Sequence, residues 1–159
     1  MLRILFLHGL ESSNECPKVD FLKSVSNCYA PKIDYTRTDL ENNLFDAVEQ
    51  FNPNVIIGSS LGGYVASLLS SYFNIKCIAF NPAIHSRPFD PMLNKLTSYS
   101  DNTNVRQIFV LGIDDDVVDP NITKELSKNM SHVEIEEVEG LGHRIPVEIL
   151  KNIYNKYLL

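Results

Sequence analysis

The stretch that decides the fold is Asn54-Val55-Ile56-Ile57-Gly58-Ser59-Ser60-Leu61-Gly62-Gly63-Tyr64. It begins with a short run of β-branched apolar residues, which predicts a buried strand. Beyond the serines, apolar residues recur at helical spacing, at Leu61, Val65, Leu68, Leu69, Tyr72 and Phe73. Ser60 therefore lies in a Gly-x-Ser-x-Gly turn between a strand and a helix, which is the context of a nucleophile elbow.

Such a turn forces the backbone of the serine into a strained conformation and brings strand and helix close together. Gly58 and Gly62 stand where a β-carbon would collide. The alternative is a glycine-rich loop that only ends a strand. Because strand, turn and helix follow in the order that an elbow needs, we interpret Ser60 as a catalytic nucleophile.

Length and composition indicate one globular domain over residues 1–159, of which 44% are hydrophobic. The net charge of -6, without a Lys/Arg stripe, argues against a nucleic-acid partner. Three cysteines without metal-ligand spacing favour reduced thiols and a cytoplasmic protein. The apolar start at residues 1–7 is too short for a signal peptide, and no later run is long enough to span a membrane.

Strands and helices are expected to alternate along the chain. The predicted strands are residues 1–7, 28–33, 55–57, 76–80, 107–111 and 133–138, the last at the sheet edge. The predicted helices are residues 19–25, 40–51, 61–73, 120–130 and 146–159, with a short one over 92–99 in an otherwise irregular covering segment, 83–104. This rhythm predicts a compact, cap-less α/β-hydrolase fold with a mostly parallel sheet of about six strands and helices on both faces.

A serine nucleophile needs a base, and four histidines are available. His132 precedes its strand and so lies at the opposite sheet edge from Ser60. His8 follows the first strand, in the loop best placed to donate N–H groups to an oxyanion, so we expect it to hold the shape of that loop. His85, in the covering segment, is the rival to His143, which follows the last predicted strand among glycines. The order Ser, Asp, His favours His143.

The acid that orients the base is harder to choose, because Asp114, Asp115, Asp116 and Asp119 share one loop. Asp119 precedes a proline and is predicted to cap a helix. The other three stay open, since only one needs to be buried and crowded carboxylates otherwise point to water. The alternating spacing and the terminal glutamate of a calcium loop are absent, so no metal is expected.

These motifs resemble the small YqiA-like esterases of the α/β-hydrolase superfamily, and the similarity runs nearly end to end. The residues that carry it are Leu7-His8-Gly9-Leu10 with Ser12-Ser13, the elbow, Asn81-Pro82-Ala83 and Gly140-x-Gly142-His143. Gly112-x-x-Asp115-x-Val117-Val118 resembles the superfamily's pattern around the acid, which implies that role for Asp115. The resemblance also implies an oxyanion hole made by the backbone N–H groups of Leu10 and Leu61.

Together these observations predict a serine carboxylesterase or thioesterase without a cofactor, acting on small-molecule esters with short acyl groups through an acyl-enzyme. The covering segment is expected to supply the acyl pocket, although ordinary packing is the alternative for each candidate. The candidates are His85, Phe89, Met92, Leu93 and Tyr99. Two other functions stay open: an acyltransferase or peptidase with the same triad, and a hydrolase-like binding protein without catalysis.

Overall fold

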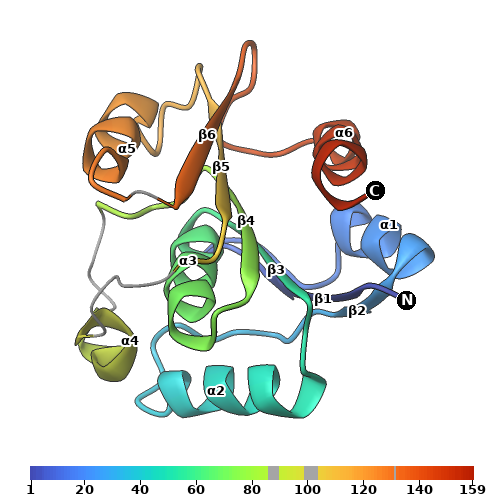
Figure 1. Ribbon diagram of the computed structural model, residues 1–159, viewed down its shortest axis with the longest axis vertical. Coiled ribbons are helices and arrows are strands. Elements are labelled where there is room, and N and C mark those ends of the chain that lie inside the picture. The colour runs from blue at the N-terminus through green and yellow to red at the C-terminus, as the bar shows by residue number, and fades with distance from the viewer. Residues whose placement is uncertain (86–89, 99–103, 131) are drawn as a thin grey trace.

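The chain alternates strands and helices as its apolar pattern predicts. The computed structural model describes residues 1–85, 90–98, 104–130 and 132–159 (Figure 1). The strands are β1 (Arg3–Leu7), β2 (Asn27–Tyr29), β3 (Val55–Ser59), β4 (Lys76–Phe80), β5 (Gln107–Gly112) and β6 (Val133–Val138). The helices are α1 (Pro17–Val25), α2 (Leu40–Phe51), α3 (Leu61–Phe73), α4 (Asn94–Ser98), α5 (Pro120–Ser127) and α6 (Val147–Leu158), with a 3₁₀ turn η1 (Asp90–Met92).

The six strands form one sheet in the order β2-β1-β3-β4-β5-β6, and all five neighbouring pairs are parallel. The chain starts in the interior at β1, moves outward to β2, and returns past β1 to β3. This reversal creates a switch point between the carboxyl ends of β1 and β3. Open α/β sheets bind their ligands at such a point.

Helices cover both faces of the sheet (Figure 1). Helices α2 and α3 bury one face together with Leu5 and Ile56, whereas α1 and α6 bury the other face together with Ile4 and Ile57. Successive residues of a strand point to opposite faces, so each inner strand contributes apolar residues to both cores. Within the described ranges, no helix has the length and apolar character needed to cross a membrane.

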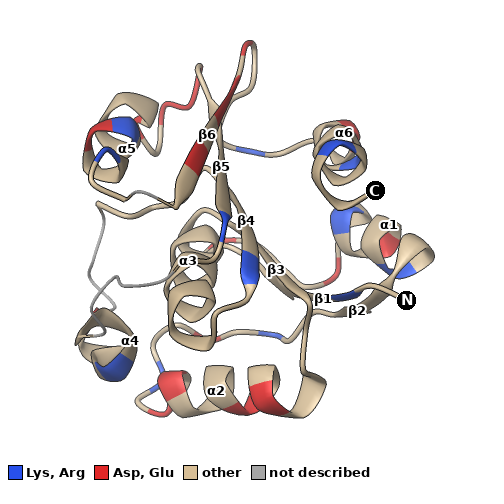
Figure 2. Cartoon of the chain, viewed as in Figure 1, with Lys and Arg blue, Asp and Glu red and all other residues tan. Residues whose placement is uncertain are grey.

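The edge strand β6 carries acidic side chains that pair with basic ones (Figure 2). The pairs are Arg106–Glu134 (2.5 Å), Lys156–Glu136 (2.7 Å) and Lys124–Glu137 (2.6 Å). Exposed ion pairs of this kind contribute little to stability. Charges along an edge do discourage another strand from adding to it, and the predicted edge position of residues 133–138 is confirmed.

The structure differs from the sequence prediction at β2, which ends at Tyr29 instead of reaching Ile33. Pro31 has no N–H group to donate to a neighbouring strand, so the chain leaves the sheet before it. The freed backbone of Ile33 binds the side chain of His8 instead. Helix α5 also ends earlier than predicted, at Ser127.

The described part of the covering segment packs on the α2/α3 face of the sheet. Leu93 and Leu96 are buried in the same core cluster as α3. The backbone N–H of Leu96 donates to Glu41 at 2.9 Å, and the Tyr64 hydroxyl donates to Asp90 at 3.0 Å. The predicted helix over 92–99 is α4, which spans Asn94–Ser98.

The close approach of α3 to the sheet generates a stability prediction. A β-carbon on Gly62 would lie 2.2 Å from the carbonyl oxygen of Leu7, and backbone atoms cannot yield as a flexible side chain can. We expect Gly62→Ala to lower the free energy of unfolding by about 3 kcal/mol, measured by urea denaturation. Gly142→Ala is the control, because its nearest atom beyond the chain neighbours would be 3.7 Å away. Equal losses in the two variants would refute the close-approach argument.

Candidate active site

Ser60 occupies the turn between β3 and α3 with a backbone that serine rarely adopts, at φ 56° and ψ -121°. Among the described residues, the other non-glycine residues with positive φ are all asparagines: Asn52, Asn74 and Asn81. Asparagine tolerates a positive φ in the left-handed helical region, where Asn52 and Asn74 lie, whereas the Ser60 combination of φ and ψ lies outside that region and costs about 1–3 kcal/mol. The predicted elbow is therefore present in its strained form, which is a feature of functional sites.

The backbone of Ser60 is held on both sides. Its N–H donates to the carbonyl of Phe80 at 2.9 Å, and its own carbonyl accepts from Tyr64 and Ala83, each at 3.1 Å. The loop after β1 also touches it, since a β-carbon on Gly9 would lie 3.3 Å from the Ser60 β-carbon. The strained conformation thus persists because its surroundings allow no other.

His143 and Asp115 form a hydrogen-bonded pair at the same edge of the sheet. The Nδ1 atom of His143 lies 2.9 Å from one Asp115 carboxylate oxygen and 3.1 Å from the other. A carboxylate only accepts, so Nδ1 carries the proton, and in neutral imidazole Nε2 then carries the lone pair. The His143 side chain is 22% exposed, whereas that of Asp115 is completely buried.

The neighbouring aspartates have other surroundings. The N–H groups of Val117 and Val118 each donate to Asp115 at 2.9 Å, which satisfies its buried charge together with His143. Asp114 and Asp116 are exposed. Asp119 caps α5 by accepting from the backbone N–H of Asn121 at 2.8 Å, as predicted. Burial and partners thus single out Asp115 within this loop.

His8 has both ring nitrogens engaged by backbone groups. Its Nε2 accepts from the N–H of Ile33 at 2.9 Å, so Nδ1 carries the proton and donates to the carbonyl of Gly9 at 2.7 Å. The Tyr35 hydroxyl donates to the His8 carbonyl at 2.5 Å, and burial raises the pKa of Tyr35, which keeps that donor protonated. These contacts support the predicted role of His8 in holding its loop.

The backbone N–H groups of Leu10 and Leu61 were predicted as oxyanion donors, and both residues lie in segments next to Ser60. Leu61 is the first residue of α3, and the first N–H groups of a helix have no acceptor within it. Leu10 follows Gly9, whose backbone lies against Ser60. The Leu10 side chain is 53% exposed, so its loop borders solvent at this edge.

Asn81 joins the segments that carry the site, a role that the sequence did not reveal. It follows β4, is 2% exposed, and accepts from the N–H of Gly112 at 2.7 Å. Its amide nitrogen donates to the carbonyls of Gly142 and His143 at 3.0 and 3.2 Å. Because Asn81 follows Phe80, which binds the Ser60 backbone, this carboxamide connects the elbow to the loop of His143. In the sequence, the Asn81-Pro82 dipeptide was the feature that could have pointed to this connecting role.

The structure describes three of the five predicted pocket residues, and their surroundings differ. His85 lies in an exposed turn, and Met92 is half-buried against the α2/α3 core. Leu93 has no exposed surface, so core packing accounts for it and contact with a substrate is not supported. Phe89 and Tyr99 lie outside the described residues.

Two of the three free cysteines, Cys28 and Cys77, are poor sources of thiolate. Burial raises the pKa of Cys28 to about 11 and also raises the pKa of Cys77, so neither supplies much thiolate at neutral pH. No group of three or more His, Cys, Asp or Glu side chains is arranged there to hold a metal ion. A hydroxyl nucleophile with an imidazole base is the chemistry that these side chains offer.

Comparison with known proteins agrees with this architecture. A sequence profile of UPF0227, an uncharacterised protein family that corresponds to the YqiA-like family, matches residues 3–135. Among solved structures, a protein described as a CIB-like hydrolase from Thermoplasma acidophilum is 21% identical, with a TM-score of 0.71 over 99% of this chain and 86% of that one. A hydrolase of the alpha/beta superfamily from Xanthomonas campestris is 19% identical, with a TM-score of 0.69 over 99% and 98%.

A third similar structure is Est1E from Butyrivibrio proteoclasticus with ferulic acid bound. It is 14% identical, with a TM-score of 0.76 over 99% of this chain and 88% of that one. At these identities the likeness concerns the fold alone. The predicted α/β-hydrolase fold is therefore confirmed.

The Asn81 contacts generate a prediction about the His143 loop. We expect Asn81→Gly to lower the free energy of unfolding by about 2 kcal/mol, because it leaves a buried N–H group and two carbonyls without their partner. Glycine keeps the left-handed backbone, so the loss reports on the carboxamide. Amide hydrogen exchange at Gly112 should accelerate, because this N–H group donates to Asn81.

Asn52→Gly is the matched control, since Asn52 has a similar φ of 50° at the end of α2. Asn81→Asp separates the contacts, because it keeps the acceptor for Gly112 but removes the donors to residues 142 and 143. Unchanged exchange at Gly112 in Asn81→Gly would refute the connecting role.

Proposed function

Because this chain belongs to the UPF0227 family, we propose that it is a serine hydrolase that cleaves carboxylic esters or thioesters. One observation supports the proposal most directly. The pair formed by His143 and the buried Asp115 is tied by Asn81 to the strand end beside the strained Ser60. The structural relatives described as hydrolases and esterases agree with this class of reaction.

In the first half of the reaction, the Ser60 oxygen attacks the carbonyl carbon of the ester while Nε2 of His143 takes the hydroxyl proton. The resulting oxyanion accepts hydrogen bonds from the N–H groups of Leu10 and Leu61. When the tetrahedral intermediate collapses, the bond to the alcohol or thiol breaks and His143 returns the proton to this leaving group. The acyl group remains on Ser60.

In the second half, a water molecule gives its proton to His143 and attacks the acyl-enzyme. The ester bond to Ser60 then breaks, the proton returns to the serine oxygen, and the carboxylic acid leaves. Asp115 stays ionised throughout and stabilises the imidazolium that forms twice in each cycle. Its buried carboxylate, bound by two N–H groups and Nδ1, is suited to this positioning.

We propose short acyl groups as the substrates, with His85, Met92, Phe89 and Tyr99 as candidates for bordering the acyl group. Exposed apolar side chains near this edge support an apolar substrate, because Leu10 and Val117 are 53% and 64% exposed. The three free cysteines are consistent with the reducing cytoplasm.

Activity-based labelling tests the nucleophile. We expect a fluorophosphonate probe to label the wild-type protein, and Ser60→Ala to lose both the label and about 10⁴-fold or more of its activity on p-nitrophenyl acetate. Ser59→Ala is the matched control, since Ser59 is the neighbouring half-exposed serine at the end of β3. His143→Ala should behave like Ser60→Ala.

An unlabelled wild-type protein would favour a binding protein without catalysis over a hydrolase. A panel of acetyl, butyryl, feruloyl and thioester substrates, with and without an acceptor alcohol or a peptide, separates ester hydrolysis from acyl transfer and peptide cleavage. If the acceptor speeds consumption of the ester and receives the acyl group, acyl transfer is the main reaction instead of hydrolysis.

The acid can be tested against its two neighbours in the loop. We expect Asp115→Asn to lower kcat by about 10³–10⁴-fold, because a carboxamide can donate to Nδ1 and so select the wrong imidazole tautomer. Asp114→Asn and Asp116→Asn should keep kcat within about twofold, because both side chains are exposed. A large loss in either control with none in Asp115→Asn would reassign the acid.

A further inference from the structure

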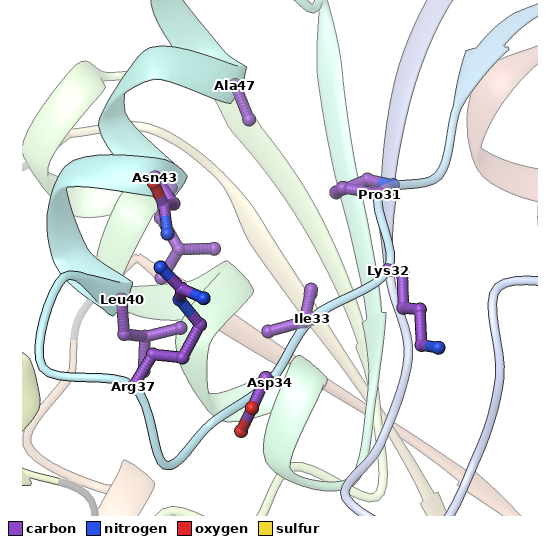
Figure 3. Close-up of a pocket in the computed structure, with 9 residues that line it drawn as sticks. Pro31, Lys32, Ile33, Asp34, Arg37, Leu40, Asn43 and Ala47 are labelled. Atoms are coloured by element: carbon purple, nitrogen blue, oxygen red, sulfur yellow. The ribbon is translucent and has the colours of Figure 1, made fainter.

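A cavity lies between α2 and the segment that follows β2 (Figure 3). Its volume is about 360 Å³, which falls within the range of small-molecule sites, roughly 300–1,000 Å³. The residues that line it are Pro31, Lys32, Ile33, Asp34, Arg37, Leu40, Asn43, Leu44 and Ala47. None of the residues assigned above to the hydrolytic reaction is among them.

The inner wall of the cavity is apolar and preformed. Leu40 and Leu44 are each 2% exposed and belong to the core cluster of this face, and Ala47 lies one turn further along α2. Figure 3 shows Pro31 on the opposite side of the space from Ala47. An alkyl or aryl group of a ligand would be removed from water against these side chains.

The polar side of the cavity presents a guanidinium group in a fixed position. The Nε and Nη2 atoms of Arg37 bind the two carboxylate oxygens of Asp39, each at 2.7 Å. A guanidinium has five N–H donors in a planar fork, so this pair leaves three for a second acceptor. The Arg37 side chain is 58% exposed and can be reached by a ligand.

The lining also holds the charged side chains of Asp34 and Lys32. One oxygen of the Asp34 carboxylate accepts from the backbone N–H and the hydroxyl of Thr36, at 3.0 and 2.6 Å, and the charge of Asp34 also interacts with Arg37. Lys32 extends away from α2 in Figure 3. Arg37 is therefore the cation beside the apolar wall, and a carboxylate is the group that fits its fork best.

One wall of the cavity also supports the loop beside Ser60. The N–H of Ile33 donates to Nε2 of His8 at 2.9 Å, and Nδ1 of His8 is bound to the carbonyl of Gly9. A ligand that packs against Ile33 stabilises the conformation in which Ile33 binds His8, because a ligand stabilises the conformation to which it binds. The cavity is thus coupled to the loop that carries Gly9 and Leu10.

We propose that this cavity binds a small organic carboxylate with an alkyl or aryl body, and that the bound ligand strengthens the support of the His8 loop. The carboxylate binds Arg37, and the apolar body lies against Leu40, Leu44 and Ala47. Ser60 is not among the residues that line this cavity.

Binding is tested with hexanoate and phenylacetate, by thermal unfolding and by amide chemical-shift titration. We expect saturable stabilisation of the wild-type protein, with the largest shifts at Leu44 and Ala47. Arg37→Gln should weaken binding by about tenfold or more, because the charge-assisted pair is lost. Ala47→Leu should weaken it as well, by filling the cavity. Amide exchange at Ile33 should slow when the ligand is bound.

The matched control is Arg106→Gln, because Arg106 also forms an exposed ion pair, with side-chain exposures of 54% and 43% against 58% and 43% for Arg37–Asp39. Hexanamide, which lacks the charge, should bind at least tenfold more weakly than hexanoate. The proposal is overturned if Arg37→Gln binds hexanoate as tightly as the wild-type protein does. It is also overturned if hexanamide binds as tightly as hexanoate, or if the amide chemical-shift changes centre on Ser60. No ester is used, so this outcome is independent of the proposed hydrolysis.

Discussion

The arrangement of this site depends on one buried carboxamide. Asn81 binds Gly112 at the end of β5 and the carbonyls of Gly142 and His143, while the residue before it binds the elbow serine. The segments that carry Ser60, Asp115 and His143 come from distant parts of the chain, and parallel strands alone bring them only to the same edge of the sheet. A single side chain with one acceptor and two donors fixes them relative to one another.

Close backbone contacts set the conditions for this connection. Gly58 and Gly62 let the first turn of α3 approach β3 and β1. In the same way, Gly112 lets the end of β5 approach the backbone of Leu141. Because α3 begins this close to the sheet, its first N–H groups, which have no acceptor within the helix, lie at the edge of the sheet. The strain at Ser60 and the missing side chains at these glycines are thus two consequences of the same tight crossing of helix over sheet.

The sequence revealed the parts of the site that are local in the chain. The elbow around Ser60 and the Asp119 cap each need only a few consecutive residues, so both were predicted correctly. From the residues alone the acid stayed open, because the burial of Asp115 depends on how its loop folds back on itself. The role of Asn81 and the cavity beside α2 were missed, since their partners lie far apart in sequence and residues 28–33 were predicted as one strand.

The two histidines at this edge differ in what their partners leave available. Both ring nitrogens of His8 are bound to backbone groups, so taking up a proton at Nε2 would break its bond to Ile33 and disturb the loop. Asp115 binds only Nδ1 of His143, which leaves the lone pair on Nε2 for a proton. Moreover, His143 has a carboxylate partner, whereas the two ring nitrogens of His8 bind backbone groups. The partners of each ring therefore favour the proposed assignment of His143 as the base and of His8 as a support.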